Sequence, residues 1–387
     1  MAPRPVTDGP ARAPAVRRHN LGLLLDALRG APSSRASLAT ATGLTRGTVA
    51  VLLDPLVEAG VLAEGVPTRS GVGRPGRPLW FAATGPVVLG ISVEVDGIDV
   101  RVSGLDGETV LRARRRRDHR RHPAADVFAR AARVARELAD RVGRPVAGAG
   151  LAVPGPVRGD GDDAVLLQAP NLPLLRGCRP ARLTGPFGTA PPVVGNEASL
   201  GALAHLGEGP DFVYVSADVG IGGGIVLDGR VLPGSRGVAG EIGHVVVERD
   251  GRACGCGGSG CVEQYAGLPA LLGDAGVAAV PELRAAARAG DPAVLGALGR
   301  AGSALGVALA SVIHVVDVPA VVLGGRYAEL GDWLVPAVRA EMRRRGLTAG
   351  PEVEVLASAH GRSAAAAGAA RAALDRVLAE PDLLLAR

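Results

Sequence analysis

Hydrophobic residues in the first sixty positions recur at helical spacing in three short segments. The first helical pattern runs from about Val16 to Arg29. Ser34 is placed to cap a second helix that ends near Thr42. Thr45 is placed to cap a third helix, which Gly60 closes. The pattern predicts three helices, of which the second and third are joined by a tight turn.

After the third helix, the pattern changes to two short apolar runs on either side of a turn-rich segment. The runs are Val61–Glu64 and Leu79–Phe81, and the segment between them is rich in Gly, Pro and Arg. Helix, helix, turn, helix and a hairpin with a basic tip is the order of a winged helix-turn-helix. We therefore predict that domain over residues 16–82. Residues 1–15, rich in Pro, Ala and Arg, are expected to be disordered.

From residue 87 onward, strand-like runs alternate with helical patterns to the end of the chain. Val87–Val95 and Ile98–Gly104 predict strands, and Ala124–Arg141 predicts a helix. Such alternation is typical of α/β architecture. We predict an α/β domain over residues 87–387, joined to the first domain by a linker near Ala82–Pro86.

The composition fits a soluble protein of two or three domains, because 387 residues exceed one ordinary core. The most apolar stretch, Leu305–Gly325, is interrupted by His314, Asp317 and Pro319. A buried helix followed by a buried strand therefore fits better than a membrane span. No segment has the pattern of a signal peptide, so we expect a cytoplasmic protein with no membrane partner.

The net charge of +5 is confined to the amino-terminal part of the chain. Residues 1–86 carry ten Arg and five acidic residues, whereas the remaining 33 Arg and 33 acidic residues balance. The chain contains no Lys. An excess of positive charge in the predicted helix-turn-helix indicates that this segment meets a polyanion, and we assign operator DNA as the partner.

The predicted third helix is the element that enters the major groove. Its first turn projects Thr45, Arg46 and Thr48 toward base edges, and Arg74 and Arg77 of the wing reach phosphates or the minor groove. The alternative is a three-helix module that binds protein instead of DNA.

Three of the four cysteines lie within eight residues and indicate a metal site in a reducing compartment. Zinc takes four nitrogen or sulfur ligands in a tetrahedron. Cys254, Cys256 and Cys261, together with the upstream His244, supply four such ligands, and the glycines between them permit tight turns. Because no coordination position is left open, we predict a structural zinc rather than a catalytic one.

The same segment carries a resemblance to a known family. Glu241-Ile-Gly-His244, followed by Cys-x-Cys-Gly-x-x-Gly-Cys-x-Glu263, resembles the signature of the ROK family of repressors, open reading frames and sugar kinases. The segment Gly73–Pro78 is similar to the family's repressor branch. Further matches fall in the family's order at Val153–Pro156, Ala169–Leu172, Gly195–Ala198, Gly220–Gly224 and Val322–Gly325. The resemblance implies an actin-like, two-lobed sugar-kinase fold with a sugar cleft between the lobes, assembled as a homodimer or homotetramer.

The resemblance also implies which residues bind a sugar or sugar phosphate. Asn196, Glu241, His244 and Glu263 match the family's sugar-contacting positions, and Asn171 is a further candidate. Carboxylates and amides of this kind accept from and donate to sugar hydroxyls. The alternative is that these groups only brace the zinc loop.

The departures from the family's kinases concern catalysis and phosphate binding. Glu197 stands where the kinases have a general-base Asp, and we include it among the ligand-binding residues. The first phosphate loop of the kinases is glycine-rich, whereas this chain has Ser92-Val-Glu94-Val-Asp96. The second loop carries Asp218. A carboxylate beside a triphosphate is repulsive, so we predict no kinase activity.

One charge run remains, formed by Arg112, Arg114 to Arg117, Arg120 and Arg121. We interpret it as a solvated strand edge or loop, with an auxiliary contact to DNA phosphate as the alternative.

Taken together, the patterns predict a sugar-responsive transcriptional repressor that is not an enzyme. Two alternatives remain open. One is an ATP-dependent sugar kinase with an added DNA-binding segment, and the other is a regulator that has lost its ligand and responds to a phosphotransferase partner protein. The sequence does not identify the sugar, the operator or the oligomeric state, nor does it separate repression from activation.

Overall fold

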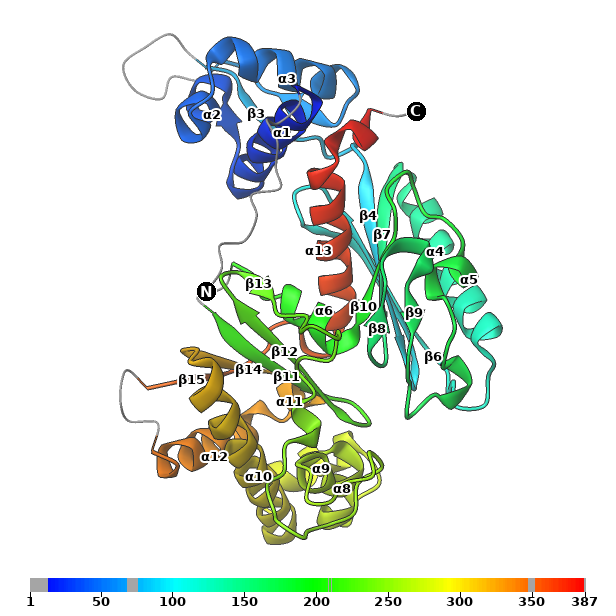
Figure 1. The fold of residues 1–387 in the computed structure, drawn as a ribbon, viewed down its shortest axis with the longest axis vertical. Helices are drawn as coiled ribbons and strands as arrows, with labels where there is room; N and C mark the ends of the chain where they lie inside the picture. The colour runs from blue at the N-terminus through cyan, green and yellow to red at the C-terminus, as the bar shows by residue number, and fades with distance from the viewer. Residues whose placement is uncertain (1–12, 68–75, 208, 210, 347–351, 386–387) are drawn as a thin grey trace, which may run out of the picture.

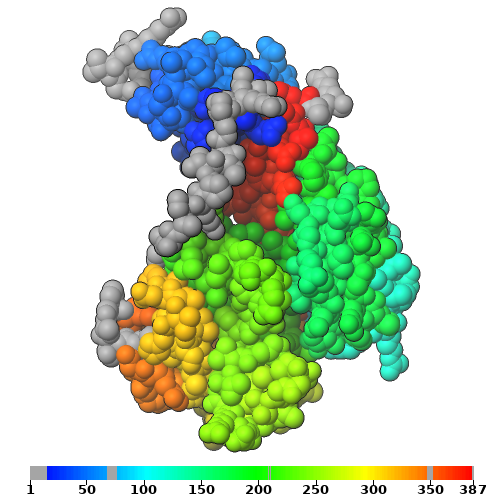
Figure 2. Space-filling view, in the orientation of Figure 1, coloured from blue at the N-terminus to red at the C-terminus, as the bar shows by residue number. Residues whose placement is uncertain are grey.

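A computed structural model describes residues 13–67, 76–207, 209, 211–346 and 352–385, which form three parts (Figure 1). A winged helix-turn-helix lies at one end of the molecule. Below it lie lobe 1, built from residues 87–196 and the carboxyl-terminal helix, and lobe 2, built from residues 197–363. Figure 2 shows the three parts as separate masses, coloured blue, cyan to green, and green to orange.

The amino-terminal part has the predicted order of helices and hairpin. Its elements are α1 (Ala13–Gly30), β1 (Ser33–Ser34), α2 (Arg35–Thr42), α3 (Arg46–Glu58), β2 (Leu62–Glu64) and β3 (Pro78–Phe81). Both predicted caps are present: the Ser34 hydroxyl accepts from the Ser37 amide, and the Thr45 hydroxyl accepts from the Thr48 amide, each at 3.1 Å. β1 was not predicted, and it pairs with β3 to complete a three-stranded sheet of order β1-β3-β2.

Lobe 1 is a five-stranded mixed sheet of order β10-β7-β4-β5-β6. The strands are β4 (Val87–Glu94), β5 (Gly97–Gly104), β6 (Thr109–Arg116), β7 (Val146–Val153) and β10 (Val193–Asn196). α4 (Ala124–Val142) and α5 (Pro180–Thr184) cover one face, where Phe128 is fully buried. A small hairpin of β8 (Val157–Arg158) and β9 (Val165–Leu166) leads from β7 toward β10.

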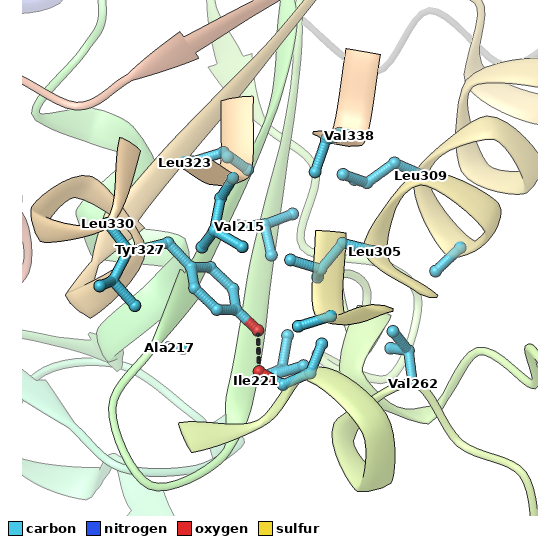
Figure 3. Packing of buried hydrophobic residues seen from close by; sticks show 14 of the residues in the cluster. Val215, Ala217, Ile221, Val262, Leu305, Leu309, Leu323, Tyr327, Leu330 and Val338 are labelled. Atoms are coloured by element: carbon cyan, nitrogen blue, oxygen red, sulfur yellow. Dashed lines mark hydrogen bonds between the residues drawn. The ribbon is translucent and has the colours of Figure 1, made fainter. Parts of the chain in front are cut away.

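Lobe 2 repeats the plan with a second sheet of order β13-β12-β11-β14-β15. Its strands are β11 (Phe212–Ala217), β12 (Ile221–Leu227), β13 (Arg230–Val231), β14 (Ala320–Gly325) and β15 (Glu354–Ala357). Its helices are α6 (Glu197–Leu203), α7 (Glu263–Ala266), α8 (Leu268–Ala275), α9 (Val280–Arg288), α10 (Pro292–Val316), α11 (Arg326–Glu329) and α12 (Gly331–Arg344). Figure 3 shows the core between sheet and helices, where Leu305 and Leu309 of α10 lie near Val338 of α12.

The predicted buried helix and strand in the most apolar stretch are confirmed as α10 and β14. By length and composition α10 alone, among the described helices, suits a membrane span. Eleven of its residues are buried, however, and nine of these belong to the hydrophobic core of lobe 2. β14 is buried along its whole length.

The carboxyl-terminal helix α13 (Ala364–Ala379) joins all three parts (Figure 1). It lies on the face of the lobe 1 sheet opposite α4, and glycines permit the close approach: a Cβ on Gly90 or Gly150 would collide with α13 backbone. Its far end packs against α1, and one continuous apolar cluster includes Leu21, Leu25, Leu374 and Val377. The winged helix-turn-helix and lobe 1 therefore share a core.

The shared core changes the expectation of a free linker near residues 82–86. Ala82 is buried, and its carbonyl accepts from the Gly85 amide at 2.9 Å. Arg144 donates to the carbonyl of Gly85 at 2.6 Å and to that of Pro86 at 3.3 Å. These hydrogen bonds hold the connection between the two domains in place, and the segments before and after it pack together in the shared core.

Candidate ligand cleft and metal centre

The four predicted zinc ligands come together in lobe 2. One ligand atom from each of His244, Cys254, Cys256 and Cys261 lies within 4.8 Å of the others. The Cys254 sulfur is 3.7 Å from Nδ1 of His244, and the Cys256 and Cys261 sulfurs are 3.7 Å apart. In a tetrahedral site with Zn–S bonds near 2.3 Å, neighbouring sulfurs lie about 3.8 Å apart. The residues therefore fit a tetrahedral metal ion.

The cysteine loop is held by backbone contacts as well as by the cluster. Val246 pairs with Cys261 and Ala253 pairs with Ser259 as isolated antiparallel bridges. The loop ends two residues before Glu263, the first residue of α7. α7 is in turn anchored by the buried Tyr327, whose hydroxyl donates to the Ala266 carbonyl at 2.9 Å (Figure 3). The metal cluster thus fixes the start of the helix that carries Glu263.

Glu263, Asn171 and Gly220 meet where the two lobes approach each other. One Glu263 carboxylate oxygen accepts from the Ile221 amide at 2.8 Å. A Cβ added to Gly220 would lie against that carboxylate and 3.7 Å from the Asn171 amide nitrogen. Glycine at this position therefore lets the two polar side chains come close to the turn between β11 and β12.

Glu241 lies beside the metal cluster. One of its carboxylate oxygens is 3.8 Å from Nε2 of His244, while Nδ1 of the same ring faces Cys254. In this orientation Nδ1 of His244 is the ring nitrogen that would meet a metal ion, and Nε2 is the one that remains for a ligand.

Asn196 and Glu197 lie at the amino-terminal end of α6, where lobe 1 passes into lobe 2. The Asn196 side-chain oxygen caps this helix and accepts from the amides of Ala198 and Ser199 at 2.9 and 3.1 Å. Its amide NH₂ remains the group that can donate to a ligand. Burial, together with the charges of Asp218 and Glu94, raises the pKa of Glu197 to about 8.

Glu94, Asp96 and Asp218, the three acidic residues at the positions of the kinases' phosphate loops, are each paired with arginine. Arg114 of β6 pairs with Glu94 and, at 2.8 Å, with Asp96. Two further arginines, Arg326 and Arg362, pair with Asp96 at 3.5 and 2.9 Å. Both also pair with Asp218, each at 3.5 Å. We call these three acids and three arginines the interlobe ion cluster.

This cluster corrects two sequence-based interpretations. Arg114 was assigned to a solvated edge, but its side chain is only 16% exposed, because β6 turns it toward Glu94. The three acids were expected to repel phosphate as unpaired negative charges. In the structure, the positive charges of arginines balance them, although the chain has no lysine. Arg112 likewise pairs with the fully buried Asp99, at 3.0 Å. The partners were missed because they lie far from the acids in sequence.

The pKa directions follow from burial and from these contacts. Burial and the charge of Asp218 raise the pKa of Glu94 to about 7, although Arg114 and Arg362 oppose the rise. Burial also raises the pKa of Asp218. At Asp96 burial is outweighed by Arg362 and Arg114, and the pKa lies below its ordinary value.

The space left in the cleft beside the cluster is small. A cavity of about 30 Å³ is lined by Glu94, Glu197, Asp218 and Arg362, together with Ser92, Tyr214 and the glycines Gly220, Gly325 and Gly361. In this arrangement of the lobes the ion cluster fills most of the floor of the cleft.

The predicted DNA-contacting residues that the structure describes lie on the surface of the winged helix-turn-helix. Thr45 and Arg46 are exposed and Thr48 is partly exposed at the start of α3. Arg77 is 60% exposed and lies 3.8 Å from Glu64. Arg74 lies outside the described residues. Arg35, which was not singled out, pairs with Asp54 at 2.7 Å and with Glu64, and so braces α2 against α3 and β2.

Comparison with known proteins agrees with this architecture. Residues 88–376 match the ROK family. The chain belongs to the ROK family. A xylose repressor of Bacillus subtilis is 27% identical over 385 residues, which cover 94% of this chain and 97% of the repressor. A kanosamine kinase of Amycolatopsis mediterranei is 34% identical over 237 residues, covering 58% of this chain and 77% of the kinase.

A solved structure extends the likeness to the whole fold. It is that of a ROK family transcriptional regulator, a homologue of the E. coli MLC protein. It superimposes with a TM-score of 0.79 at 22% identity and covers 96% of this chain and 99% of its own. This ROK protein therefore shares its fold with a family regulator over nearly its full length, whereas its match to the kanosamine kinase covers only part of the chain.

Proposed function

We infer that this ROK protein is a sugar-responsive transcriptional repressor, with DNA bound by residues 16–82 and a sugar or sugar phosphate bound in the cleft between the lobes. The single observation that carries the proposal is the unbroken packing from cleft to DNA-binding domain. Glu197 begins α6, α6 packs against α13, and α13 packs against α1. A change in the cleft therefore has a rigid path to the recognition helix.

The contact between α6 and α13 is close enough to transmit small movements. A Cβ on Gly368 of α13 would collide with the Leu200 carbonyl of α6. Packed interfaces of this kind shift as units, because they cannot deform gradually. A ligand that binds one arrangement of the lobes better than another would thereby select one placement of α1.

The proposed ligand residues are Asn171, Asn196, Glu197, Glu241, His244 and Glu263. Asn171 and Glu263 meet at Gly220, Glu241 and His244 meet beside the metal cluster, and Asn196 adjoins Glu197. Such a set supplies acceptors and amide donors, which suit the hydroxyls of a sugar.

We further propose that His244, Cys254, Cys256 and Cys261 hold one structural zinc ion. The support is the 3.7 Å spacing of their ligand atoms and the soft thiolate donor set. The ion would cross-link a glycine-rich loop that otherwise has little core, and through it would fix Glu241 and Glu263. It supplies no open coordination position for catalysis.

The kinase alternative is disfavoured by the ion cluster. Phosphoryl transfer needs cations or backbone donors free to meet the nucleotide phosphates. Here Arg114, Arg326 and Arg362 are already paired with Glu94, Asp96 and Asp218. We therefore propose a regulator without kinase activity, located in the cytoplasm with its DNA, and assembled as a homodimer or homotetramer that spans two half-sites.

The test begins with selection of DNA from a random library by the purified protein. A thermal-shift screen with monosaccharides, amino sugars and their phosphates then finds the sugar. Calorimetry with and without operator must show reciprocal changes, since linkage requires sugar and DNA to alter each other's affinity by the same factor. A bound sugar that leaves operator affinity unaltered would contradict the switch. If a chain lacking residues 1–82 kept the sequence preference, the assignment of DNA binding would be wrong.

A further inference from the structure

A second concave site lies outside the cleft, between the end of β6 and the first turns of α4. It is a cavity of about 430 Å³, within the range of small-molecule pockets. Its polar lining consists of Arg117, His119, His122, Arg130 and Arg133, with Asp126 as the one acidic residue. We call it the β6–α4 cavity.

The cavity concentrates positive charge that carboxylates elsewhere in the protein do not offset. Within the described part of the chain, none of Arg117, Arg130 and Arg133 forms an ion pair with an acidic residue. Burial lowers the pKa of Arg130, and the neighbouring charges of Arg117 and Arg133 lower it further. Three arginines beside the single carboxylate of Asp126 leave an excess of positive charge, so an anion bound among them would be stabilised.

Three buried nitrogen atoms in the lining lack hydrogen-bond partners among the described residues. They are Nε2 of His119, Nδ1 of His122 and Nε of Arg130. His119 is only 1% exposed, and its Nδ1 is engaged with the Glu94 carbonyl oxygen at 2.8 Å. Its free Nε2 is therefore the ring edge that remains for the cavity. A buried polar atom left unsatisfied is unfavourable, and a suitable ligand atom would remove that cost.

His122 supplies a hydrogen-bond donor whose position is fixed by the contact of its ring with Arg117. Its Nε2 accepts from Arg117 at 2.6 Å, so in this tautomer the hydrogen is on Nδ1, the unpartnered atom. The cavity thus offers an imidazole N–H and guanidinium N–H groups, all of which donate to oxygen. Tetrahedral oxyanions, with several acceptor oxygens and a double negative charge, match this set.

We propose that the β6–α4 cavity binds the phosphate group of a small anionic ligand. Guanidinium groups of Arg130 and Arg133 face the phosphate oxygens, His122 donates from Nδ1, and His119 takes up a proton at Nε2 when the dianion binds. This inference does not rest on the proposed roles in DNA or sugar binding.

The position of the cavity excludes DNA phosphate as its occupant. β4 starts next to the winged helix-turn-helix. β5 runs antiparallel to β4, and β6 runs antiparallel to β5, so the last residues of β4 and β6 both lie at the end of the sheet that is far from the winged helix-turn-helix. An eight-residue strand such as β4 spans about 26 Å. The cavity therefore lies at the end of lobe 1 remote from α3 (Figure 1).

The cavity is in contact with the ion cluster through the backbone. The Arg117 amide donates to the Asp96 carbonyl at 3.0 Å, and the His119 amide donates to the Val95 carbonyl at 2.9 Å. Together with the bond from His119 to the Glu94 carbonyl, these fix the cavity wall to the segment whose side chains lie at the floor of the cleft.

The test is calorimetry of the full chain with inorganic phosphate, glucose 6-phosphate and glucose at constant ionic strength. We expect both phosphates to bind at the cavity, and Arg130→Gln and Arg133→Gln each to weaken them at least tenfold. Arg141→Gln, on the exposed last turn of the same helix, is the matched control and should leave affinity unchanged. Thermal unfolding of each variant shows that it is folded, and removing an unpaired arginine should not lower its midpoint.

A second measurement follows the uptake of a proton by His119 when phosphate binds. The pKa of His119 lies below its ordinary value because of burial and of Arg130 and His122, so a bound dianion should raise it. Titrations near pH 6 in two buffers of different ionisation enthalpy give the net proton change, which includes the proton that the phosphate releases when it binds as the dianion. His119→Asn, which retains a donor toward the Glu94 carbonyl, should release more protons to the buffer than the unaltered protein, because it lacks the imidazole that takes up the proton.

Equal phosphate affinity in Arg130→Gln and Arg141→Gln would overturn the proposal. Displacement of phosphate by chloride at equal ionic strength would also overturn it, because it would reveal a general counter-ion effect. A loss of operator affinity in Arg130→Gln as large as the loss of phosphate affinity would assign the residue to DNA instead.

Discussion

Among single residues, Glu197 and Glu94 are acids whose pKa values lie well above the ordinary value of a glutamate. Burial raises the pKa of Glu197 to about 8 and that of Glu94 to about 7. The folded state therefore holds protons that the unfolded state releases near pH 4.5. Since the folded state binds more protons between these values, its stability falls as pH rises from about 4.5 to 8 and is constant beyond.

Replacing Glu197 with Gln tests this assignment. Glu197→Gln cannot ionise, so at pH 8 we expect it to raise the free energy of unfolding by about 1.4 kcal/mol or more, the value of one pKa unit. At about pH 4, below the pKa of the unfolded state, the gain should largely vanish. Urea unfolding at the two pH values measures it, with the exposed turn residue Glu108→Gln as control. A gain that is equal at both pH values would contradict a raised pKa.

Arg46 is the residue on which sequence-specific DNA binding should depend. It is exposed at the first position of α3, where a recognition helix meets base edges. Arg46→Ala should cost about 1–3 kcal/mol of operator affinity and relax the preferred sequence. Arg77→Ala, on the wing, should weaken all sequences alike and flatten the salt dependence. Fluorescence anisotropy with operator and scrambled DNA at several salt concentrations separates the two effects.

At the scale of elements, the cysteine loop and the α6–α13 contact are the two features that position the cleft. The loop leads directly into α7, and so any disturbance of it reaches Glu263. α13 lies against the sheet of lobe 1, against α6 and against α1.

Loss of one thiolate should release the metal from the loop. Protein purified without added metal should contain about one zinc per chain, and Cys256→Ser and Cys261→Ser should contain little. Cys178→Ser is the control, because Cys178 lies in lobe 1, away from the cluster. The two loop variants should also melt at lower temperature, because zinc binding contributes directly to folding. Unchanged zinc in Cys256→Ser would refute the assignment.

A methyl group at Gly368 should disturb the contact between α6 and α13. Because the added Cβ meets the backbone carbonyl of Leu200, the two helices must separate, and we expect a loss of about 1–3 kcal/mol or more in unfolding free energy. Gly299→Ala is the control: it lies in α10 with open space around it, and alanine there should stabilise by about 1 kcal/mol. Chemical denaturation of both variants decides it, and equal effects would contradict the close packing.

In the whole molecule, the interlobe ion cluster and the shared core each join two of the three parts. The cluster joins lobe 1 to lobe 2 through Arg326 and Arg362, which reach Asp96 across the cleft. The core joins lobe 1 to the DNA-binding domain. A movement of one lobe against the other must rearrange the ion pairs of this cluster. A ligand that binds in the cleft would therefore act directly on these ion pairs.

The intact protein should therefore not phosphorylate sugars. With its phosphate-loop positions occupied by paired charges, it should release no ADP above the sugar-free background in a coupled assay with ATP and magnesium. A ROK sugar kinase run beside it controls for the assay. Sugar-dependent turnover at ordinary enzyme rates, lost in Glu197→Gln, would establish the kinase alternative instead.

Local features of this protein were determined by sequence alone. Ser34 and Thr45 cap their helices because a hydroxyl reaches the amide three residues ahead whatever surrounds it. The cysteine cluster is equally local, since three of its four ligands lie within eight residues and glycines allow the turn. The strands of the α/β domain could be predicted because buried strands are nearly continuous apolar runs.

Long-range contacts were decided only by the tertiary structure. Arg362 and Glu94 are 268 positions apart, and nothing near either residue indicates that they pair. Arg114 and the exposed Arg116 lie on the same face of β6, and only the position of Glu94 and Asp96 in the fold buries Arg114 and not Arg116. The sequence of α13 is that of an alanine-rich helix, but only the fold reveals that it packs against lobe 1, α6 and the DNA-binding domain together. Packing between distant segments depends on their shapes and on the space between them, which local pattern does not encode.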